Sequence, residues 1–330
     1  MMPQKLAEFL AEWNNDADRL LVHTSGSTGQ PKPLWVEKRR MEASARITCQ
    51  FLGLGKGDTA LLCMPLDYIA GKMMVVRALT CGLHLVSVNP TSHPMSEVGD
   101  DVIDFAAMVP LQVARTLQVE EERERLMRVG HLIIGGGAID PALEQALHSF
   151  PNNVWSTDCM TETLSHIALR RLNGPDSDAW YTPFDGVSVS LDAEGCLTID
   201  APEVCEATLS TNDRAVLHAD GRRFRIVGRR DNVVCSGGIK LQIEEIERKL
   251  SAHIRVPFII TKRQDPELGE ALVLLVQDSN TEPYHALCRR LLDRYEQPRL
   301  IATVACVPLT PTGKPARHEA ELLANRIGCR

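Results

Sequence analysis

The 330-residue sequence is poor in aromatic side chains and has no basic block. Phe, Trp and Tyr make up 5% of the chain, and 43 acidic residues outnumber 36 Lys and Arg residues, which gives a net charge of −7. Proteins that bind nucleic acid by electrostatic attraction need a positively charged surface. The composition therefore argues against a nucleic-acid partner and favours small molecules.

Closely spaced cysteine pairs and long apolar runs are also absent. None of the ten cysteines forms a C-x-x-C pair, so the sequence suggests neither a zinc ribbon nor a disulfide framework, and we expect reduced thiols. The most apolar window, MMVVRALTCGLHLVSV, contains Arg77 and His84 and is too short to cross a bilayer. The N-terminal stretch predicts an acidic amphipathic helix rather than a secretory signal. We therefore expect a cytoplasmic protein without membrane insertion.

The sequence does contain strand-length apolar runs that alternate with helix-period segments. RLLVHT, TALLCMP and HLVSV are separated by helical patterns near residues 37–52 and 72–81, an order that predicts a parallel sheet with crossover helices. After the strand and glycine loop HLIIGGGAID, Asp140 and Pro141 are the expected N-cap and first residue of another helix. The expected fold class is α/β.

The pattern changes twice in the second half of the chain. From about residue 187 to 227, short alternating runs with turn residues predict a small β subdomain. From residue 231, a hairpin, helices and strands predict a separate α+β unit of roughly 100 residues, which is a normal domain size. We therefore expect an N-terminal domain over residues 1–230 and a C-terminal domain over residues 231–330.

The stretch HTSGSTGQPK follows an apolar strand and is dense in glycine and hydroxyl groups. It departs from the P-loop pattern G-x-x-x-x-G-K-[ST] because Lys32 is followed by Pro33. Backbone NH groups and hydroxyls can still donate to phosphate oxygens, and a lysine adds positive charge. The stretch predicts a triphosphate site, although its composition also allows a flexible Ser/Gly loop. The expected phosphate contacts are Thr24, Ser25, Gly26, Ser27, Thr28, Gly29 and Lys32.

This stretch resembles the signature loop of the acyl-adenylate-forming superfamily, which includes acyl-CoA synthetases, luciferases and peptide-synthetase adenylation domains. Other segments resemble the family's further motifs, in the family's order: GGGAID, STDCMTET, TND, GRRDNVVCSGGIKLQIEEIE and LTPTGKPAR. Together they cover nearly the whole chain. The resemblance implies ATP, Mg²⁺ and CoA as cofactors, and a ligase that joins an acid to CoA through an acyl-AMP intermediate.

The same resemblance implies a role for three catalytic residues. Thr161 corresponds to a hydroxyl that contacts phosphate, and Glu162 to the carboxylate that binds magnesium, a cation that prefers oxygen ligands. Lys314 corresponds to the lysine that catalyses adenylation from the C-terminal domain. Taken as residues alone, Glu162 could be a solvated acid and Lys314 an inert surface lysine.

The resemblance also implies where ATP and CoA bind. Asp231 corresponds to the family's hinge, so we expect a mobile C-terminal domain, and the next loop, with Gly237 and Gly238, is expected to line the CoA channel. As a dinucleotide fingerprint the glycine loop fails, because Asp140 stands where a glycine is needed. The remaining expected ATP-binding residues are Gly135, Gly136, Gly137, Asp158, Asp213 and Arg229.

Three positions depart from the family's motifs. Asp158 and Cys159 stand where the family has an aromatic residue and a glycine. An aspartate cannot stack on adenine, and its charge costs binding free energy unless it is offset. Asn212 replaces the middle glycine of T-G-D, a mild change because Asn tolerates left-handed backbone. A catalytically silent protein that binds a nucleotide or an acyl group therefore stays open as an alternative.

The segment LDYIAGKMMVVRAL resembles that of o-succinylbenzoate:CoA ligases of menaquinone biosynthesis, especially short forms that begin just before the phosphate loop. This implies an aromatic acid as the substrate, with Arg77 paired to its ring carboxylate and with Ser165 and Tyr68 in contact with the acid. Alternatively, Arg77 lies on a helix surface and Ser165 only fills a loop. An enzyme that loads an aryl or small acid onto a carrier protein also stays open. Candidates for either the pocket wall or the core are Leu66, Met73 and Met74.

Overall fold

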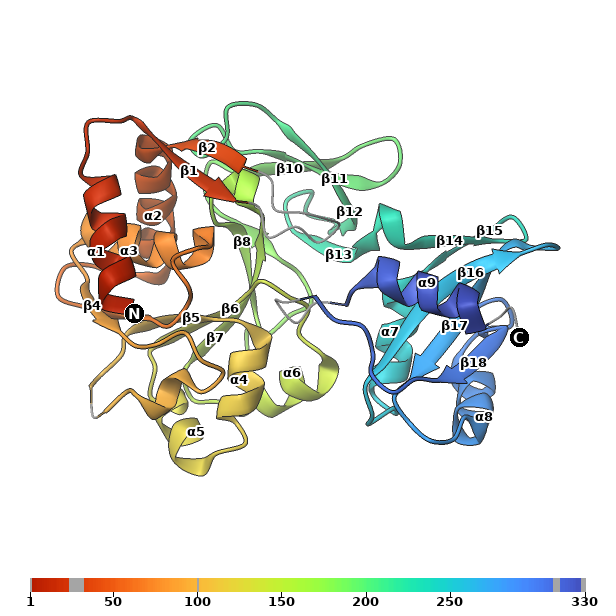
Figure 1. Ribbon diagram of the computed structural model, residues 1–330. Helices are drawn as coiled ribbons and strands as arrows, with labels where there is room; N and C mark the ends of the chain where they lie inside the picture. Colours follow the sequence, from red (N-terminus) through yellow and green to blue (C-terminus); the bar gives the residue numbers. More distant parts are fainter. Residues whose placement is uncertain (1, 24–32, 100, 311–314, 328–330) are drawn as a thin grey trace.

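The computed structural model describes residues 2–23, 33–99, 101–310 and 315–327 (Figure 1). The predicted phosphate-loop residues, 24–29 and 32, and the predicted catalytic residue Lys314 lie outside the described residues. Their roles therefore stay predictions.

A seven-stranded mixed sheet forms the centre of the larger part of the molecule. Its strand order is β4-β3-β5-β6-β7-β8-β9; the first five strands run parallel, and β8 and β9 pair antiparallel. This confirms the predicted α/β class. The strands are β3 (Thr59–Leu62), β4 (His84–Ser87), β5 (Phe105–Met108), β6 (His131–Ile134), β7 (Asn153–Cys159), β8 (His166–Arg171) and β9 (Thr182–Pro183).

Helices cover both faces of this sheet (Figure 1). Successive residues of a strand point to opposite faces, and accordingly Leu62 lies in the hydrophobic cluster with α2 and α3, whereas Leu61 lies in the cluster with α4, α5 and α6. The α-helices of this part are α1 (Met2–Trp13), α2 (Lys38–Leu52), α3 (Ile69–Cys81), α4 (Pro110–Thr116), α5 (Glu120–Met127) and α6 (Pro141–Leu147). Three short 3₁₀ helices are η1 (Pro94–Ser96), η2 (Thr161–Thr163) and η3 (Arg230–Asn232).

Helix α6 begins as the sequence predicts. The Asp140 carboxylate accepts hydrogen bonds of 2.9 Å from the backbone N–H groups of Ala142 and Leu143. These two groups have no partner inside the helix, so the cap satisfies them and fixes where the chain turns after the glycine loop.

The first strand was wrongly assigned to the parallel sheet. β1 (Arg19–His23) pairs antiparallel with β2 (Pro33–Glu37) in a separate two-stranded ribbon. A parallel partner needs a crossover of about a dozen residues or more, whereas an antiparallel partner can follow directly after a loop. β2 was missed because it begins at a proline, which is tolerated only at strand starts and edges.

Two further sheets follow along the chain. The predicted small β subdomain is confirmed as a four-stranded antiparallel sheet of β10 (Ser188–Leu191), β11 (Cys196–Asp200), β12 (Leu209–Leu217) and β13 (Phe224–Arg229). The other is a five-stranded sheet with the order β15-β14-β17-β16, and its fifth strand, β18, pairs parallel with β17. Its strands are β14 (Val233–Ser236), β15 (Ile239–Gln242), β16 (Phe258–Asp265), β17 (Gly269–Val276) and β18 (Leu300–Thr303).

The five-stranded sheet has helices of its own and lies beside the larger part of the molecule (Figure 1). One face buries Ile260 with α7 (Ile243–Ser251) and α8 (Glu282–Leu291), and the other buries Ile259 with α9 (Arg317–Ile327). That residues 231–330 move as a domain stays a prediction. Within the described ranges, no helix combines the length and the apolar character needed to cross a bilayer.

Candidate active site

Arg77 lies in α3 and is almost completely buried. Only 2% of its surface is exposed, and its helix neighbours Met73 and Met74 are fully buried in the hydrophobic core together with Leu66. The alternative that Arg77 lies on a helix surface is therefore wrong. A buried cation costs free energy unless a charge or hydrogen bonds compensate it. The partners of Arg77 therefore indicate whether it stabilises the fold or binds a ligand.

The polar contacts of Arg77 do not include a carboxylate among the described residues. Its Nη2 donates to the Ser165 hydroxyl and, at 3.5 Å, to the Thr48 hydroxyl. Its Nη1 meets only the Met74 thioether at 3.8 Å, a weak acceptor, and its Nε has no partner there. The guanidinium also lies 5.9 Å from the Phe105 ring centroid. The positive charge of Arg77 therefore has no acidic partner among the described residues, and the N–H groups of its Nη1 and Nε are available to donate to a ligand.

Burial lowers the pKa of Arg77 to about 10, which still leaves the guanidinium protonated at neutral pH. A protonated, buried arginine without an acidic partner attracts an anion such as a carboxylate. The predicted acid-binding residue therefore sits in surroundings that favour this role.

Ser165 reaches Arg77 through a strained turn after η2. Leu164 has φ of +66°, and it is the one residue other than glycine with positive φ in the described part of the chain. The turn is held by Thr163, whose hydroxyl lies 2.7 Å from the carbonyl oxygen of Ser165. Such strain costs about 1 to 3 kcal/mol and is concentrated at functional sites. Ser165 is therefore fixed beside Arg77 rather than filling a loop.

Glu162 lies three residues before Ser165, in the same segment. Its side chain is exposed and contacts no cation or donor within the described ranges, whereas neighbouring Thr161 is buried. The same residues contain no cluster of three metal-binding side chains. Magnesium is typically held by one or two carboxylates together with substrate phosphates. A single free carboxylate fits Mg²⁺ bound with a nucleotide, and not an all-protein metal cage.

The predicted adenine loop lies at the carboxyl end of β6, against β7. A Cβ atom on Gly135 would lie 2.4 Å from the Thr157 hydroxyl oxygen, and Gly136 has φ of +79°. Glycine suits both positions, and it lets the backbone of the loop approach Thr157 of β7, the residue before Asp158. Ligands of open α/β sheets bind at this end of the strands.

Asp158 is partly buried, and no hydrogen bond or ion pair to its carboxyl group occurs within the described part of the chain. Burial, followed by the negative charge of Asp213, raises the pKa of Asp158 to about 7. A carboxyl group with this pKa is about half protonated at neutral pH, so the charge that an aspartate brings to this position is reduced.

Asp213 and Arg229, two of the expected ATP-binding residues, form an ion pair. They are cross-strand neighbours on β12 and β13, and Arg229 Nη1 lies 3.2 Å from the Asp213 carboxylate. Burial nevertheless raises the pKa of Asp213, against the effect of Arg229. Arg229 also pairs with Asp231 at 3.0 Å, which ties the predicted ribose site to the predicted hinge in η3.

Two sets of predicted residues lie away from Arg77. Tyr68 is the N-cap of α3 and 37% exposed, about 13 Å along the helix axis from Arg77 at 1.5 Å per residue, and no contact joins the two. Gly237 and Gly238 form the turn between β14 and β15, with φ of +56° and +82°, which is the turn type that favours consecutive glycines. Their role at a CoA channel stays a prediction.

Sequence reasoning missed two residues of the Arg77 site, Thr48 and His166. The His166 ring lies between the two hydroxyls, with Nε2 3.1 Å from Thr48 Oγ1 and Nδ1 3.2 Å from Ser165 Oγ. His166 follows Ser165 in the chain, which was a weak signal. Thr48 comes from α2 and had none, because only the packing of α2 against α3 brings it to Arg77.

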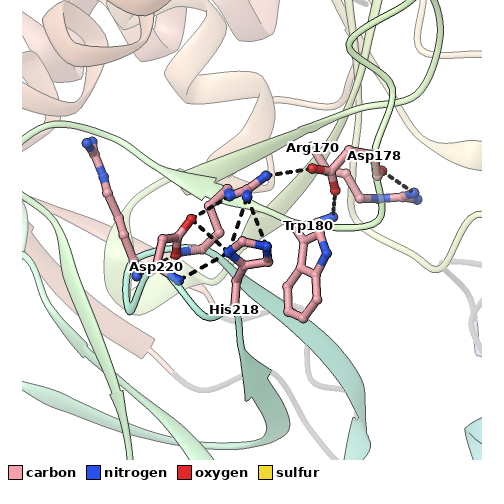
Figure 2. A network of polar contacts seen from close by, with 7 residues as sticks. Arg170, Asp178, Trp180, His218 and Asp220 are labelled. Carbon is pink, nitrogen blue, oxygen red and sulfur yellow. Dashed lines mark hydrogen bonds and ion pairs between the residues drawn. The ribbon is translucent and has the colours of Figure 1, made fainter.

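A second polar cluster contains more charged groups but no unpaired arginine (Figure 2). Arg170 makes a bidentate ion pair with Glu144 at 2.7 and 3.1 Å, and Arg223 pairs with Asp178 and Asp220, each at 2.7 Å. An open pocket of about 380 Å³ adjoins Arg170 and Asp178. Because these charges neutralise one another, the cluster stabilises the fold and lacks the free binding groups of the Arg77 site.

Comparison with known proteins places these residues in a family context. The family model described as AMP-binding enzyme matches residues 7–195, which is more than half of the chain. A crystal structure of an acyl-CoA synthetase (AMP-forming)/AMP-acid ligase II-like protein from Dyadobacter fermentans is 33% identical, with a TM-score of 0.66; the match covers 97% of this chain and 93% of that one.

Two more distant relatives carry a more specific name. A 2-succinylbenzoate–CoA ligase from Bacillus velezensis is 23% identical, over 92% of this chain and 68% of the relative. The o-succinylbenzoate coenzyme A synthetase from Bacillus subtilis, solved in complex with ATP and magnesium ion, is 19% identical, with a TM-score of 0.75 over 91% of this chain and 69% of that one. The latter likeness concerns the fold alone.

Proposed function

Because the chain belongs to the family of AMP-binding enzymes, we propose that it is an ATP-dependent acid:CoA ligase whose substrate is o-succinylbenzoate. In the first half-reaction, a carboxylate of the acid attacks the α-phosphate of ATP and gives acyl-AMP and pyrophosphate. In the second, the CoA thiolate attacks the acyl carbon and releases AMP, giving o-succinylbenzoyl-CoA. A mixed anhydride with AMP is a far better acyl donor than a free carboxylate.

The observation that carries the choice of acid is the buried, uncompensated charge of Arg77. o-Succinylbenzoate has two carboxylates, so one can react with ATP while the other, on the ring, is held by the enzyme. A monocarboxylic acid would leave the Arg77 guanidinium buried and unpaired after binding, which costs several kcal/mol. The site therefore favours a diacid, and the relatives named 2-succinylbenzoate–CoA ligase support this one.

The chain's own residues then have these proposed parts. Glu162 supplies the one protein carboxylate for Mg²⁺, which neutralises phosphate charge during adenylation. The backbone of Gly135 to Gly137 faces the base, and Asp213 with Arg229 holds the ribose. Lys314, outside the described residues, is proposed to act in adenylation only. Lys314→Ala should then abolish acyl-AMP formation and spare thioester formation from supplied acyl-AMP.

Pyrophosphate release tests the proposed function. The protein is incubated with ATP, Mg²⁺ and CoA, and with o-succinylbenzoate, benzoate or a fatty acid. Release with o-succinylbenzoate alone is the expected result. Efficient release with benzoate or the fatty acid would contradict the proposed role of Arg77 as a site for a second carboxylate.

Two other functions correspond to distinct outcomes of the same test. Acyl-AMP formation without thioester formation on CoA would point to an enzyme that loads a carrier protein. No pyrophosphate with any acid, from protein shown to be folded, would point to a catalytically silent binder. The unpaired carboxyl group of Asp158 beside the adenine loop is the observation that favours the silent binder.

A further inference from the structure

We propose that His166 is a positioning residue, whose neutral Nε2–H tautomer directs the Ser165 hydroxyl so that it accepts from Arg77 and fixes the guanidinium for an incoming carboxylate. This inference deepens the proposed function and rests on it for the identity of the ligand. Its structural content, the tautomer and the direction of each hydrogen bond, can be measured without any activity.

The direction of the chain of hydrogen bonds is set at Thr48. A hydroxyl has one proton, and that of Thr48 is donated to the backbone carbonyl oxygen of Ser44 at 3.0 Å, the usual bond of a threonine in a helix. The Thr48 oxygen can therefore only accept from the His166 ring, whose Nε2 lies 3.1 Å away. His166 Nε2 thus carries the proton, and Nδ1 does not.

The remaining bonds follow from that tautomer. A bare Nδ1 is an acceptor, so the Ser165 hydroxyl donates its proton to His166 at 3.2 Å. The Ser165 hydroxyl proton is then used in that bond, and the Ser165 oxygen accepts from Arg77 Nη2. The sequence of donors is Arg77 to Ser165 to His166 to Thr48 to the Ser44 carbonyl, and every bond points in the same direction.

The charged and titratable groups around this chain keep the imidazole neutral. His166 is buried, and burial and the charge of Arg77 both lower its pKa. The titratable groups that face Arg77 are the thiols Cys49 from α2, Cys81 from α3 and Cys159 from β7. No carboxylate of the described residues contacts the imidazole, so protonating His166 would place a second cation beside Arg77 without an acid to compensate it. It would also remove the acceptor that Ser165 uses.

The consequence for binding is preorganisation. Nη2 of Arg77 is committed to Ser165 and Thr48, so the guanidinium plane is fixed, and the donors left for a ligand are on Nη1 and Nε. A site whose donors are already oriented loses less conformational entropy when it binds. Ser165 contributes to acid binding through Arg77 and has no proton left to donate to the acid itself.

The tautomer can be read directly from nitrogen chemical shifts of the imidazole in protein labelled with ¹⁵N-histidine. The spectrum of His166→Gln identifies the His166 signals among those of the chain's ten histidines. We expect the neutral Nε2–H form, unchanged from about pH 6 to 8, where an ordinary histidine titrates. An Nδ1–H form, or protonation near pH 6.5, would overturn the inference whatever the enzyme's activity.

Two substitutions at His166 separate positioning from packing. Asn places its amide oxygen near the position of Nδ1 and can still accept from Ser165, whereas Gln places its amide near Nε2 and cannot. We expect the KM for o-succinylbenzoate to rise about tenfold or more in His166→Gln and less than about threefold in His166→Asn, which corresponds to one hydrogen bond to a charged group. The KM for ATP should stay unchanged in both variants.

Thermal unfolding of both variants accompanies the kinetics. Equal increases in KM for the acid, or parallel increases for acid and ATP, would show that His166 only packs. If a variant fails to fold, the nitrogen spectrum of the unsubstituted protein still decides. If the unsubstituted protein releases no pyrophosphate with any acid but shows the expected tautomer, the proposed function fails and the hydrogen-bond chain stands.

Discussion

Two arginines of this molecule both lie beside an aromatic ring but differ in burial and in charge pairing: Arg77 is almost completely buried, and Arg170 is partly buried. The guanidinium of Arg77 lies 5.9 Å from the Phe105 ring centroid, and that of Arg170 lies 5.9 Å from the Tyr181 ring centroid. Arg170 makes a bidentate ion pair with Glu144 (Figure 2 shows Arg170 in its cluster), whereas Arg77 contacts only hydroxyls and a thioether in the described part of the chain.

The difference shows in the pKa of each arginine. Burial lowers the pKa of Arg77 to about 10, whereas burial, the largest single effect on the pKa of Arg170, is outweighed there by Glu144 and Tyr181 together, so that pKa is raised. The charge of Arg170 is compensated by Glu144 within the folded chain. Arg77 has no acidic partner among the described residues, which is the arrangement we expect of a residue whose anionic partner is a ligand.

Two carboxyl groups, Asp220 and Asp158, also differ in whether they have partners within the fold. Asp220 accepts from Arg223 and from two backbone N–H groups, which lower its pKa. Asp158 has no such partner, and burial with the nearby charge of Asp213 raises its pKa to about 7. Arg77, Asp158 and Glu162, which have no charged partner among the described residues, all belong to the candidate active site.

Glu162→Gln should give the largest effect. It keeps the shape of the side chain but removes the charge that Mg²⁺ needs, so we expect the rate of pyrophosphate release to fall about 1,000-fold. Because Glu162 is exposed and unpaired in the described structure, the melting temperature should not change. Activity restored at high Mg²⁺ would show weakened metal binding; a full rate at ordinary Mg²⁺ would remove Glu162 from the mechanism.

Arg77→Met should give the next largest effect, on the acid rather than on ATP. The variant keeps an unbranched apolar side chain but loses the cation, and we expect kcat/KM for o-succinylbenzoate to fall about 100-fold, the cost of truncating a buried charge pair. The matched control is Arg170→Met, for which we expect a change of less than about threefold. Similar losses in both variants would erase the distinction between the two arginines.

Stability should respond in the opposite order. Arg170→Met loses a partly buried ion pair of about 1 kcal/mol, so its melting temperature should fall by about 2 to 4 °C. Arg77→Met removes a buried charge that no described acid compensates, and its melting temperature should stay constant or rise. Calorimetry of both variants without ligand checks this. A strongly destabilised Arg77→Met would mean that Arg77 supports the fold.

Asp158→Asn should give the smallest effect, visible in the pH dependence of stability. Because the folded pKa of about 7 exceeds the ordinary aspartate pKa of 3.8, the native state holds more protons than the unfolded state between these values, and stability falls as pH rises from about 4 to about 7. The variant lacks this loss, so its melting temperature should exceed that of the unsubstituted protein by about 2 °C or more at pH 8 and match it at pH 4.

Asp220→Asn is the control for that measurement, with the sign reversed. Its depressed pKa contributes stability that is present above the ordinary aspartate pKa of 3.8 and lost as the pH falls below it. The variant should therefore be less stable at pH 8. If Asp158→Asn behaved in the same way, its carboxylate would have a partner within the fold.

Local patterns predicted those parts of the fold that depend on local chemistry. The cap at Asp140 and the hairpin with Gly237 and Gly238 each depend on residues that are close together in the chain, and the structure contains both. β1 was misplaced because an antiparallel partner can follow directly after a loop, and a periodic pattern does not show which strand is the partner.

The proposed acid site around Arg77 contains residues that the sequence patterns did not predict. Arg77 and Ser165 were predicted through a resemblance, but Thr48 and His166 complete the site from α2 and β8, and 118 residues separate them in the chain. Burial also decided the state of Arg77 and Asp158. Neither the packing of α2 against α3 nor the loss of water around a side chain can be read from the motif that contains it.

The most direct measurement compares two acids on two proteins. o-Succinylbenzoate and 4-oxo-4-phenylbutanoate share the reacting carboxylate and differ in the ring carboxylate, and pyrophosphate release is measured with each for the unsubstituted protein and for Arg77→Met. We predict that the unsubstituted protein prefers the diacid by about 100-fold in kcat/KM and that Arg77→Met loses this preference. A preference that survives the substitution would show that Arg77 does not bind the ring carboxylate.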